Sequence, residues 1–438
     1  MIKENSFTIK GDICWSKSPD KLTSLKNGYL VCIDGKVEGT FAKLPDLYHS
    51  LPVIDFSSFL VIPGLVDLHI HAPQFAVRGL GMDLELLDWL KNHAFVEEVK
   101  YADEDYARIA YSQFVDHLKQ GPNTRMAVYA TIHTRATSIL MDLLEESGLV
   151  SLVGKINMDR NCPPNLREKS ASASLSATGE WLSECIGRYK NTNPILTPRF
   201  IPSCSDKLMM GLAGLQKKHN LPVQSHLSEN CSEIEWVRKL RPESSGYGCA
   251  YRDNDLFGAD ADRDVPTLMA HCVWSDDEEI KLMAERQVYA VHCPQSNINL
   301  SSGIAPVRRF LKAGVPVGLG SDVAGGAHSS IFRAMSDAIQ VSKLLGVMLN
   351  LHENALSLEE AFYMGTVAGG VFFGKTNMGT SGSFEPGNDF DALVIDEKNI
   401  SAPFEFSIRD RLERIVYLSD DRNIKDKFVK GIRLCKTP

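Results

Sequence analysis

The sequence predicts an α/β protein, a (β/α)8 TIM barrel that carries a small β-sandwich built from both ends of the chain. The barrel is predicted by eight short apolar runs that alternate with longer helical stretches in the middle of the chain. Such alternation is typical of parallel strands joined by crossover helices, and eight strands close a barrel. The runs lie at residues 65–71, 125–133, 151–159, 194–200, 221–226, 266–272, 287–294 and 315–322.

The sandwich is predicted by the composition of the two ends. Three segments near the start and three near the end are short and β-rich: 7–16, 28–41, 52–62, 389–398, 414–423 and 424–434. Asp34-Gly35 is a strong hairpin signal within the second segment. We therefore expect two domains, with residues 1–62 plus 379–438 forming the sandwich and residues 63–378 forming the catalytic barrel. The polar run "SASASLSATGE" at 170–180 is expected to begin a helix.

Composition excludes several classes of partner. The net charge is −8 and the sequence has no basic stripe, so a nucleic acid is not an expected partner. No stretch has the length and apolarity of a membrane span, and the first ten residues lack the apolar core of a signal peptide. The ten cysteines are scattered without a C-x-x-C pair, which is typical of reduced thiols. We expect a cytoplasmic protein.

Reactive side chains end almost every predicted barrel strand. They are His69, His71, His133, Arg199, His226, His271, His292 and Asp322. In a (β/α)8 barrel the carboxyl ends of the strands form the catalytic face, so these side chains should meet at one mouth. A single histidine at a strand end is ordinarily a hydrogen-bonded pocket residue, whereas the whole set predicts an active site.

The histidines and the aspartate predict a metal site. His69 and His71 occupy positions i and i+2 of a strand, so they share one face and can bind one cation. Taken alone, the pair could equally be two hydrogen-bonded core histidines. With His226, His271 and Asp322 the set becomes imidazoles plus one carboxylate, which suits zinc or a similar divalent metal. The glycines before Asp322 let its loop approach the metal closely.

Glu229 is a candidate proton shuttle. It follows His226 by three residues, just past the predicted strand end. A carboxyl group there can reach a bound water and a substrate nitrogen without being a metal ligand. The alternative is a solvated glutamate at the start of a helix.

These residues belong to longer motifs, which include "PGLVDLHIHAPQ", "LLDWL", "YATIHT", "TPRF", "QSHLSEN", "MAHC", "HCPQSN", "GLGSDVAGG" and "YLSDDRNI". On these motifs the chain resembles the guanine deaminases of the amidohydrolase superfamily over nearly its whole length, and "TPRF", "SHLSEN" and "DDRNI" are specific to that branch. The resemblance implies one zinc ion per chain, with Fe2+ as the alternative ion. It assigns the metal to His69, His71, His226 and Asp322, and it implies a homodimer.

The activity implied by the resemblance is hydrolysis of guanine to xanthine and ammonia. Asp322 would take a proton from the attacking water, and Glu229 would protonate N3 and help the amino group leave. His271 would stabilise the new oxygen without being a metal ligand. His133 and His292 are expected to be supporting or structural residues.

The residues expected to bind this small-molecule substrate are His71, Ala72, Pro73, Gln74, Arg199, Phe200, His226, Glu229, His271 and Asp322. Arg199 would donate to the C6 carbonyl of guanine, the Gln74 amide can both donate and accept, and Phe200 would cover the flat ring. In the alternative interpretation, Arg199 pairs with a carboxylate elsewhere and Gln74 caps a loop.

Two features depart from the family pattern or need explanation. Pro122-Asn123 stands where the family usually reads "GTT", which predicts a changed local turn under the barrel with an effect on stability. Lys155 lies on a predicted barrel strand, where relatives with two metals use a carboxylated lysine, and we expect a buried, hydrogen-bonded lysine. Three other functions stay open: a deaminase of a pterin, cytosine or adenosine-like base, a two-metal hydantoinase-like amide hydrolase, and a binding or scaffolding protein without the chemistry.

Overall fold

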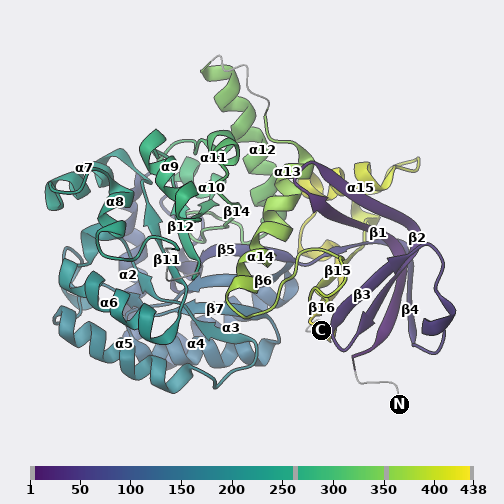
Figure 1. Cartoon of the computed structure of the whole chain (residues 1–438), viewed down its shortest axis with the longest axis horizontal. Helices are drawn as coiled ribbons and strands as arrows, with labels where there is room; N and C mark the ends of the chain where they lie inside the picture. Colours follow the sequence, from purple (N-terminus) through teal and green to yellow (C-terminus); the bar gives the residue numbers. More distant parts are fainter. Residues whose placement is uncertain (1–4, 260–264, 350–354, 435–438) are drawn as a thin grey trace.

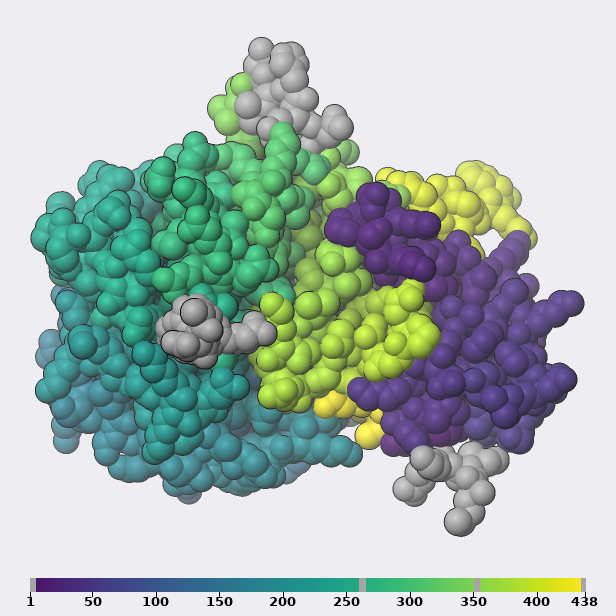
Figure 2. All heavy atoms as spheres, in the orientation of Figure 1, coloured from purple at the N-terminus to yellow at the C-terminus, as the bar shows by residue number. Residues whose placement is uncertain are grey.

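The computed structural model describes residues 5–259, 265–349 and 355–434. The middle of the chain forms a body of strands and surrounding helices, and the two ends of the chain lie together in a β-rich region beside it (Figure 1). In the space-filling view the purple N-terminal residues and the yellow C-terminal residues occupy the same side of the molecule (Figure 2). No helix in the described ranges has both the length and the apolarity needed to cross a bilayer.

The strands of the body are parallel and form two four-stranded sheets, ordered β5-β6-β7-β9 and β11-β12-β13-β14, and a two-stranded sheet, β10-β8. Each predicted run contains at least part of one strand. The strands are β5 (Leu65–His71), β6 (Asn123–Tyr129), β7 (Val150–Gly154), β8 (Ile156–Asn157), β9 (Thr192–Pro194), β10 (Thr197–Pro198), β11 (Val223–Leu227), β12 (Thr267–His271), β13 (Tyr289–His292) and β14 (Val317–Leu319).

The two sheets are joined at both ends. Leu196 forms a parallel bridge with Val223, which links the segment after β9 to β11. On the other side, the Asp322 amide donates to the His69 carbonyl at 2.8 Å, and the His71 amide donates to the Val323 carbonyl at 3.0 Å. The chain that follows β14 is therefore hydrogen-bonded to β5, the first parallel strand.

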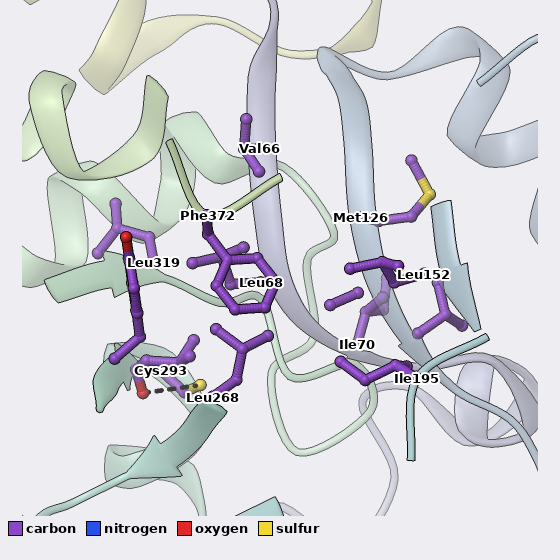
Figure 3. Packing of buried hydrophobic residues seen from close by; sticks show 14 of the residues in the cluster. Val66, Leu68, Ile70, Met126, Leu152, Ile195, Leu268, Cys293, Leu319 and Phe372 are labelled. Carbon is purple, nitrogen blue, oxygen red and sulfur yellow. Dashed lines mark hydrogen bonds between the residues drawn. The ribbon is translucent and has the colours of Figure 1, made fainter. Parts of the chain in front are cut away.

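Apolar side chains fill the space between these strands. Val66, Leu68 and Ile70 alternate along β5 with Asp67, His69 and His71, and all seven residues of the strand are buried. Figure 3 shows Leu68 and Ile70 among Leu268 and Leu319 from other strands and Ile195, which follows β9. The period of two places the apolar set in the core and leaves the other face for polar side chains.

Helices follow the strands and cover them. The first group comprises α1 (Leu86–Trp89), α2 (Phe95–Glu98), α3 (Glu104–Gln120), α4 (Thr134–Ser147), α5 (Ala171–Cys185), α6 (Asp206–His219) and α7 (Cys231–Leu240). The second comprises α8 (Tyr247–Arg252), α9 (Asp277–Glu285), α10 (Pro294–Asn299), α11 (Val307–Ala313), α12 (Ile331–Met348), α13 (Leu358–Tyr363) and α14 (Gly369–Lys375). The helix predicted from "SASASLSATGE" is confirmed: Ser170 is the N-cap of α5 and its hydroxyl accepts from the Ala173 amide.

The strands from both ends form one seven-stranded sheet, ordered β17-β16-β15-β4-β1-β2-β3. They are β1 (Phe7–Ser18), β2 (Lys21–Ile33), β3 (Lys36–Phe41), β4 (Val53–Pro63), β15 (Ala392–Ile395), β16 (Ile424–Val429) and β17 (Ile432–Leu434). Asp34 and Gly35, with φ of 51° and 77°, make the predicted turn between β2 and β3. Phe7 packs edge-on against Phe390 with ring centroids 5.2 Å apart, so the core of this sheet joins the two ends of the chain.

One predicted β segment is wrong. Residues 414–423 were expected to be β-rich because of their β-branched and aromatic side chains, but their first half completes helix α15 (Ile408–Leu418). Ser407 caps the helix by accepting from the Asp410 amide, and Leu412, Ile415 and Val416 are buried at helical spacing. A one-sided apolar stripe with a good cap outweighs β propensity here.

Asn123 does more than alter a local turn. It begins β6 and is 2% exposed; its side-chain amide donates to the Ser329 carbonyl at 2.7 Å and accepts from the Ile331 amide at 3.4 Å. The Lys427 ammonium donates to the Asn123 carbonyl at 3.0 Å. Asn123 therefore links β6 to the start of α12 and to β16.

Candidate active site

Four side chains converge at the carboxyl ends of the parallel strands. The His69 Nε2 atom lies 3.2 Å from His71 Nε2 and 3.2 Å from Asp322 Oδ1, and His71 Nε2 lies 3.4 Å from the same oxygen. The ring centroid of His226 lies 4.9 Å from that of His69. His271 joins from β12, with its Nε2 atom 3.8 Å from Asp322 Oδ2. Strands far apart in the sequence thus bring imidazoles and a carboxylate to one point.

The charge states of this cluster suit metal binding. Burial lowers the pKa of His69, and it lowers the pKa of His71 and of His226 well below the usual range, so the imidazoles are neutral. Burial by itself raises the pKa of Asp322, but the adjacent His69 and His271 outweigh it and hold the value at about 2. Neutral imidazole nitrogens and an ionised carboxylate are electron-pair donors, and three nitrogens with one oxygen match the preferences of zinc.

Neighbouring groups fix the orientation of the rings. The Nδ1 atom of His226 lies 2.7 Å from the Arg199 carbonyl, to which it can only donate, so Nε2 carries the free lone pair. The Nδ1 atom of His271 lies 2.9 Å from the side-chain oxygen of Asn297. A Cβ atom on Gly320 would lie 2.7 Å from the His69 Cβ, so the close approach expected from the glycines before Asp322 is present.

Glu229 lies beside the cluster. One of its carboxyl oxygens is 3.5 Å from His271 Nε2, and the side chain is buried. Burial raises the pKa of Glu229 well above its usual range, and the nearby Asp322 carboxylate adds to the rise. The raised pKa favours the protonated form of Glu229, and the solvated-helix interpretation is wrong because the side chain is only 3% exposed.

A cavity of about 420 Å3 opens onto the cluster and Glu229. Its lining residues are His71, Gln74, Leu86, Trp89, Leu90, Arg199, Phe200, His226, Glu229, Glu233, His271, Leu300 and Asp322. The lining combines aromatic and aliphatic walls with a few polar groups, as is typical of small-molecule sites. Those polar groups lie in two places, the cluster and the pair Gln74 and Arg199.

Gln74 and Arg199 share one buried carboxylate. The Arg199 guanidinium donates to Glu98 through two nitrogens, at 2.6 Å and 3.0 Å, and the Gln74 amide nitrogen donates to Glu98 at 2.9 Å. The Gln74 oxygen accepts from the Ala324 amide at 3.3 Å. Arg199 pairs with a carboxylate, as one interpretation expected, and it also lines the cavity, so its contact with a base stays a prediction.

Comparisons with known proteins agree with this site. Residues 60–433 match the amidohydrolase family. The chain belongs to the amidohydrolase family. It is 38% identical over 387 residues to the guanine deaminase of Dictyostelium discoideum, covering 87% of this chain and 84% of the relative. It is 30% identical to the guanine deaminase of Escherichia coli, covering 94% of this chain and 93% of the relative.

Among solved structures, the chain is similar to a guanine deaminase from C. acetobutylicum with bound guanine in the active site. The two chains are 45% identical with a TM-score of 0.94, covering 98% of this chain and 100% of the other. The resemblance to the guanine deaminases that the motifs indicated is confirmed.

Other residues of this amidohydrolase that the sequence singled out lie outside the cavity wall. Ala72 and Pro73 are buried at the start of the short 3-10 helix Ala72–Val77. His133 precedes α4, and His292 lines a different cavity together with residues of α11 and α12. Lys155 is buried and donates to Glu168 at 2.5 Å, which is the hydrogen-bonded lysine that was expected.

The sequence did not identify every polar residue of the amidohydrolase site. Glu98 was missed because it lies in helix α2, outside any strand end. Glu233 was also missed; it lines the cavity and accepts from the Glu229 and Asn230 amides at 3.1 Å and 3.3 Å. Its signal was available, since Asn230 and Glu233 have the spacing of a capping box at the start of α7.

Proposed function

We propose that this chain is a guanine deaminase, which hydrolyses guanine to xanthine and ammonia. The observation that carries the proposal is a single cavity lined both by the histidine–aspartate cluster with Glu229 and by Arg199 with Gln74. The first group can supply the chemistry and the second can recognise a flat polar base. The guanine deaminases with 30–45% identity over most of the chain support the same activity.

One zinc ion per chain is the cofactor that fits this donor set, with Fe2+ as the alternative. His69, His71, His226 and Asp322 would hold it. A bound zinc ion lowers the pKa of a water molecule to near neutrality and so makes a nucleophile available at pH 7. Lys155 supports one metal rather than two, because its ammonium group already pairs with Glu168.

The chain's own residues would move the protons. Asp322, which is ionised, would accept a proton from the attacking water as it adds to C2 of guanine. Glu229 would donate its proton to N3, take up the proton of the new C2 hydroxyl and deliver it to the leaving amino group, so that ammonia departs. The proton held by Asp322 would then restore the Glu229 carboxyl group. His271 would stabilise the new oxygen. Its Nε2 atom lies 3.5 Å from a Glu229 carboxyl oxygen.

Recognition of the base would come from the other wall. Arg199 and Gln74 would meet the C6 carbonyl of guanine, and Phe200 would cover an edge of the ring. Phe200 is itself held edge-on against Trp236, with ring centroids 6.2 Å apart. Adenine carries an amino donor at C6 and would leave the arginine without an acceptor.

We also infer the finer architecture expected from the sequence. The eight parallel strands would close a (β/α)8 barrel of residues 63–378, which the hydrogen bonds between β5 and the chain after β14 support. The seven-stranded sheet with its own aromatic core would be the small β-sandwich of residues 1–62 plus 379–438, whose outermost residues lie outside the described part. A homodimer in the cytoplasm stays a prediction.

A panel assay tests the function. Metal-loaded protein is incubated with guanine, adenine, cytosine and a pterin, and ammonia release is measured. We expect a strong preference for guanine, by about 10⁴-fold over adenine, because the pocket is matched to a specific acceptor. Arg199→Ala should lose guanine activity and keep its metal. Comparable turnover of both purines, or preferred release from a pterin or cytosine, would assign the chain to another deaminase.

A further inference from the structure

Glu98 connects the two polar side chains of the recognition wall. It ends helix α2 and is 1% exposed. One of its oxygens accepts from both Gln74 and Arg199, and the other accepts a second bond from Arg199. A single buried carboxylate therefore fixes the arginine and the amide relative to each other.

The carboxylate also decides which end of the Gln74 amide faces it. An ionised carboxylate only accepts hydrogen bonds, so Gln74 must turn its nitrogen toward Glu98. The Gln74 oxygen then faces the Ala324 amide, which only donates. Both ends of the amide are thus oriented, and its second N–H remains for a ligand.

Arg199 is oriented in the same way. Its guanidinium has five N–H groups, and within the described chain the side chain donates to Glu98 alone. Its position is also fixed by Phe95, since the guanidinium carbon lies 4.8 Å from that ring centroid. The N–H groups of Arg199 and Gln74 that Glu98 does not use give this wall of the cavity hydrogen-bond donors and no acceptors.

The pair also balances charge. An arginine buried to 3% exposure without a counter-ion would be costly, and its field would favour an anionic ligand. With Glu98 in a two-pronged pair the wall is neutral overall and keeps its donors. A neutral base with a carbonyl oxygen at this point fits such a wall, whereas a base with an amino group there does not.

We propose that Glu98 is a positioning residue that makes this wall donate only, and so sets the preference for a 6-oxo over a 6-amino purine. This inference rests on the proposed function in that a purine is taken to occupy the cavity. Replacing Glu98 by glutamine would supply an N–H group beside Gln74. The Gln74 amide could then exchange its long 3.3 Å bond from the Ala324 amide for one from residue 98, and the turned oxygen could also accept from a 6-amino group.

The test is equilibrium binding of hypoxanthine and adenine, two purines that lack the C2 amino group and are not deaminated at C2. Calorimetry on the metal-loaded protein gives both dissociation constants. We expect hypoxanthine to bind about 100-fold more tightly than adenine, and Glu98→Gln to reduce this ratio by about tenfold or more, the effect of a directed hydrogen bond. For guanine, KM should rise more than kcat falls, because the reacting atoms are untouched.

The matched control is Glu360→Gln, which breaks a similar two-pronged pair with Arg308, at 2.6 Å and 2.9 Å, away from the cavity. It should leave the hypoxanthine-to-adenine ratio unchanged. If Glu98→Gln does not fold, Glu98→Asp, which keeps the charge and shortens the reach, should still lower the ratio.

The outcomes separate the two proposals. A folded, metal-loaded Glu98→Gln or Glu98→Asp protein with the parent's ratio overturns the role of Glu98, as does a parent that binds both purines equally or binds neither. If the unmodified protein fails to deaminate guanine while substitution of Glu98 still lowers the preference for hypoxanthine over adenine, that result leaves this inference standing and refutes the proposed function.

Discussion

Replacing Arg125 by methionine should destabilise the protein, because this side chain joins the parallel strands to the C-terminal part of the chain. Arg125 lies on β6 with a fully buried side chain. The guanidinium donates to Asp391 at 2.6 Å, to Asp389 at 2.8 Å and to the Gly379 carbonyl at 2.6 Å. Methionine has a similar length and can fill the space, but it leaves these acceptors without their donor.

The magnitude follows from the burial of the partners. The Asp389 side chain is 5% exposed but keeps an ion pair with Lys36, whereas the Asp391 side chain is 0% exposed and loses its countercharge. Removing one partner of a buried ion pair costs about 3–5 kcal/mol. Unfolding entropies of about 2 cal/mol/K per residue give roughly 0.9 kcal/mol/K for 438 residues, so Tm should fall by about 3–5 °C.

Differential scanning calorimetry of the metal-loaded protein measures this fall. The control is Arg309→Met, the same substitution in an exposed pair with Asp277, whose side chains are 43% and 92% exposed. Exposed pairs contribute about 0–1 kcal/mol, so the control should melt within about 1 °C of the parent. If the Tm of Arg125→Met falls no more than that of Arg309→Met, the argument that this buried pair holds the two regions together is refuted.

Three further predictions concern the site and the departure from the family pattern. Glu229→Gln should keep its metal but lower kcat for guanine by about 10²–10⁴-fold, because the amide cannot donate a proton to N3, and near-parental turnover would remove Glu229 from the mechanism. His69→Ala and Asp322→Ala should each lose the single bound ion, as measured by elemental analysis; two ions per parent chain would favour a two-metal hydrolase. Asn123→Ala should lower the free energy of unfolding by about 1–3 kcal/mol through its lost bonds to the segment that begins with Ser329, and an unchanged denaturation midpoint would reduce Asn123 to a turn residue.

The features that could be predicted from the sequence are those set by the spacing of residues within one short segment. The period of two in "LVDLHIH" places His69 and His71 on one face, and any parallel sheet then brings that face to the strand ends where Asp322 and His226 lie. The same logic located Glu229, since a residue just past a strand end remains near the site. Segment 414–423 failed because β-branched residues at helical spacing satisfy both patterns over a short length.

The parts that the sequence could not give depend on long-range pairing. Glu98 and Arg199 are 101 residues apart, and Arg125 and Asp391 are 266 residues apart. Nothing in either local sequence distinguishes these charges from the solvated charges that most such residues carry. Only the folded arrangement shows that each is buried and paired, and burial is what gives such a pair a large energetic effect.

Asp67 links the strand that carries His69 and His71 to the loop that carries Asp322. It lies two residues before His69 on β5, and its carboxylate accepts from the His69 amide at 3.1 Å and from the Ser321 amide at 3.0 Å. The Ser321 hydroxyl donates to its second oxygen at 2.5 Å. Because Ser321 precedes Asp322, one carboxylate sets the spacing between the strand that carries His69 and His71 and the loop that carries Asp322. Burial raises the pKa of Asp67 to about 7 despite these hydrogen bonds, so the fold retains an unfavourable buried acid that holds these two segments together.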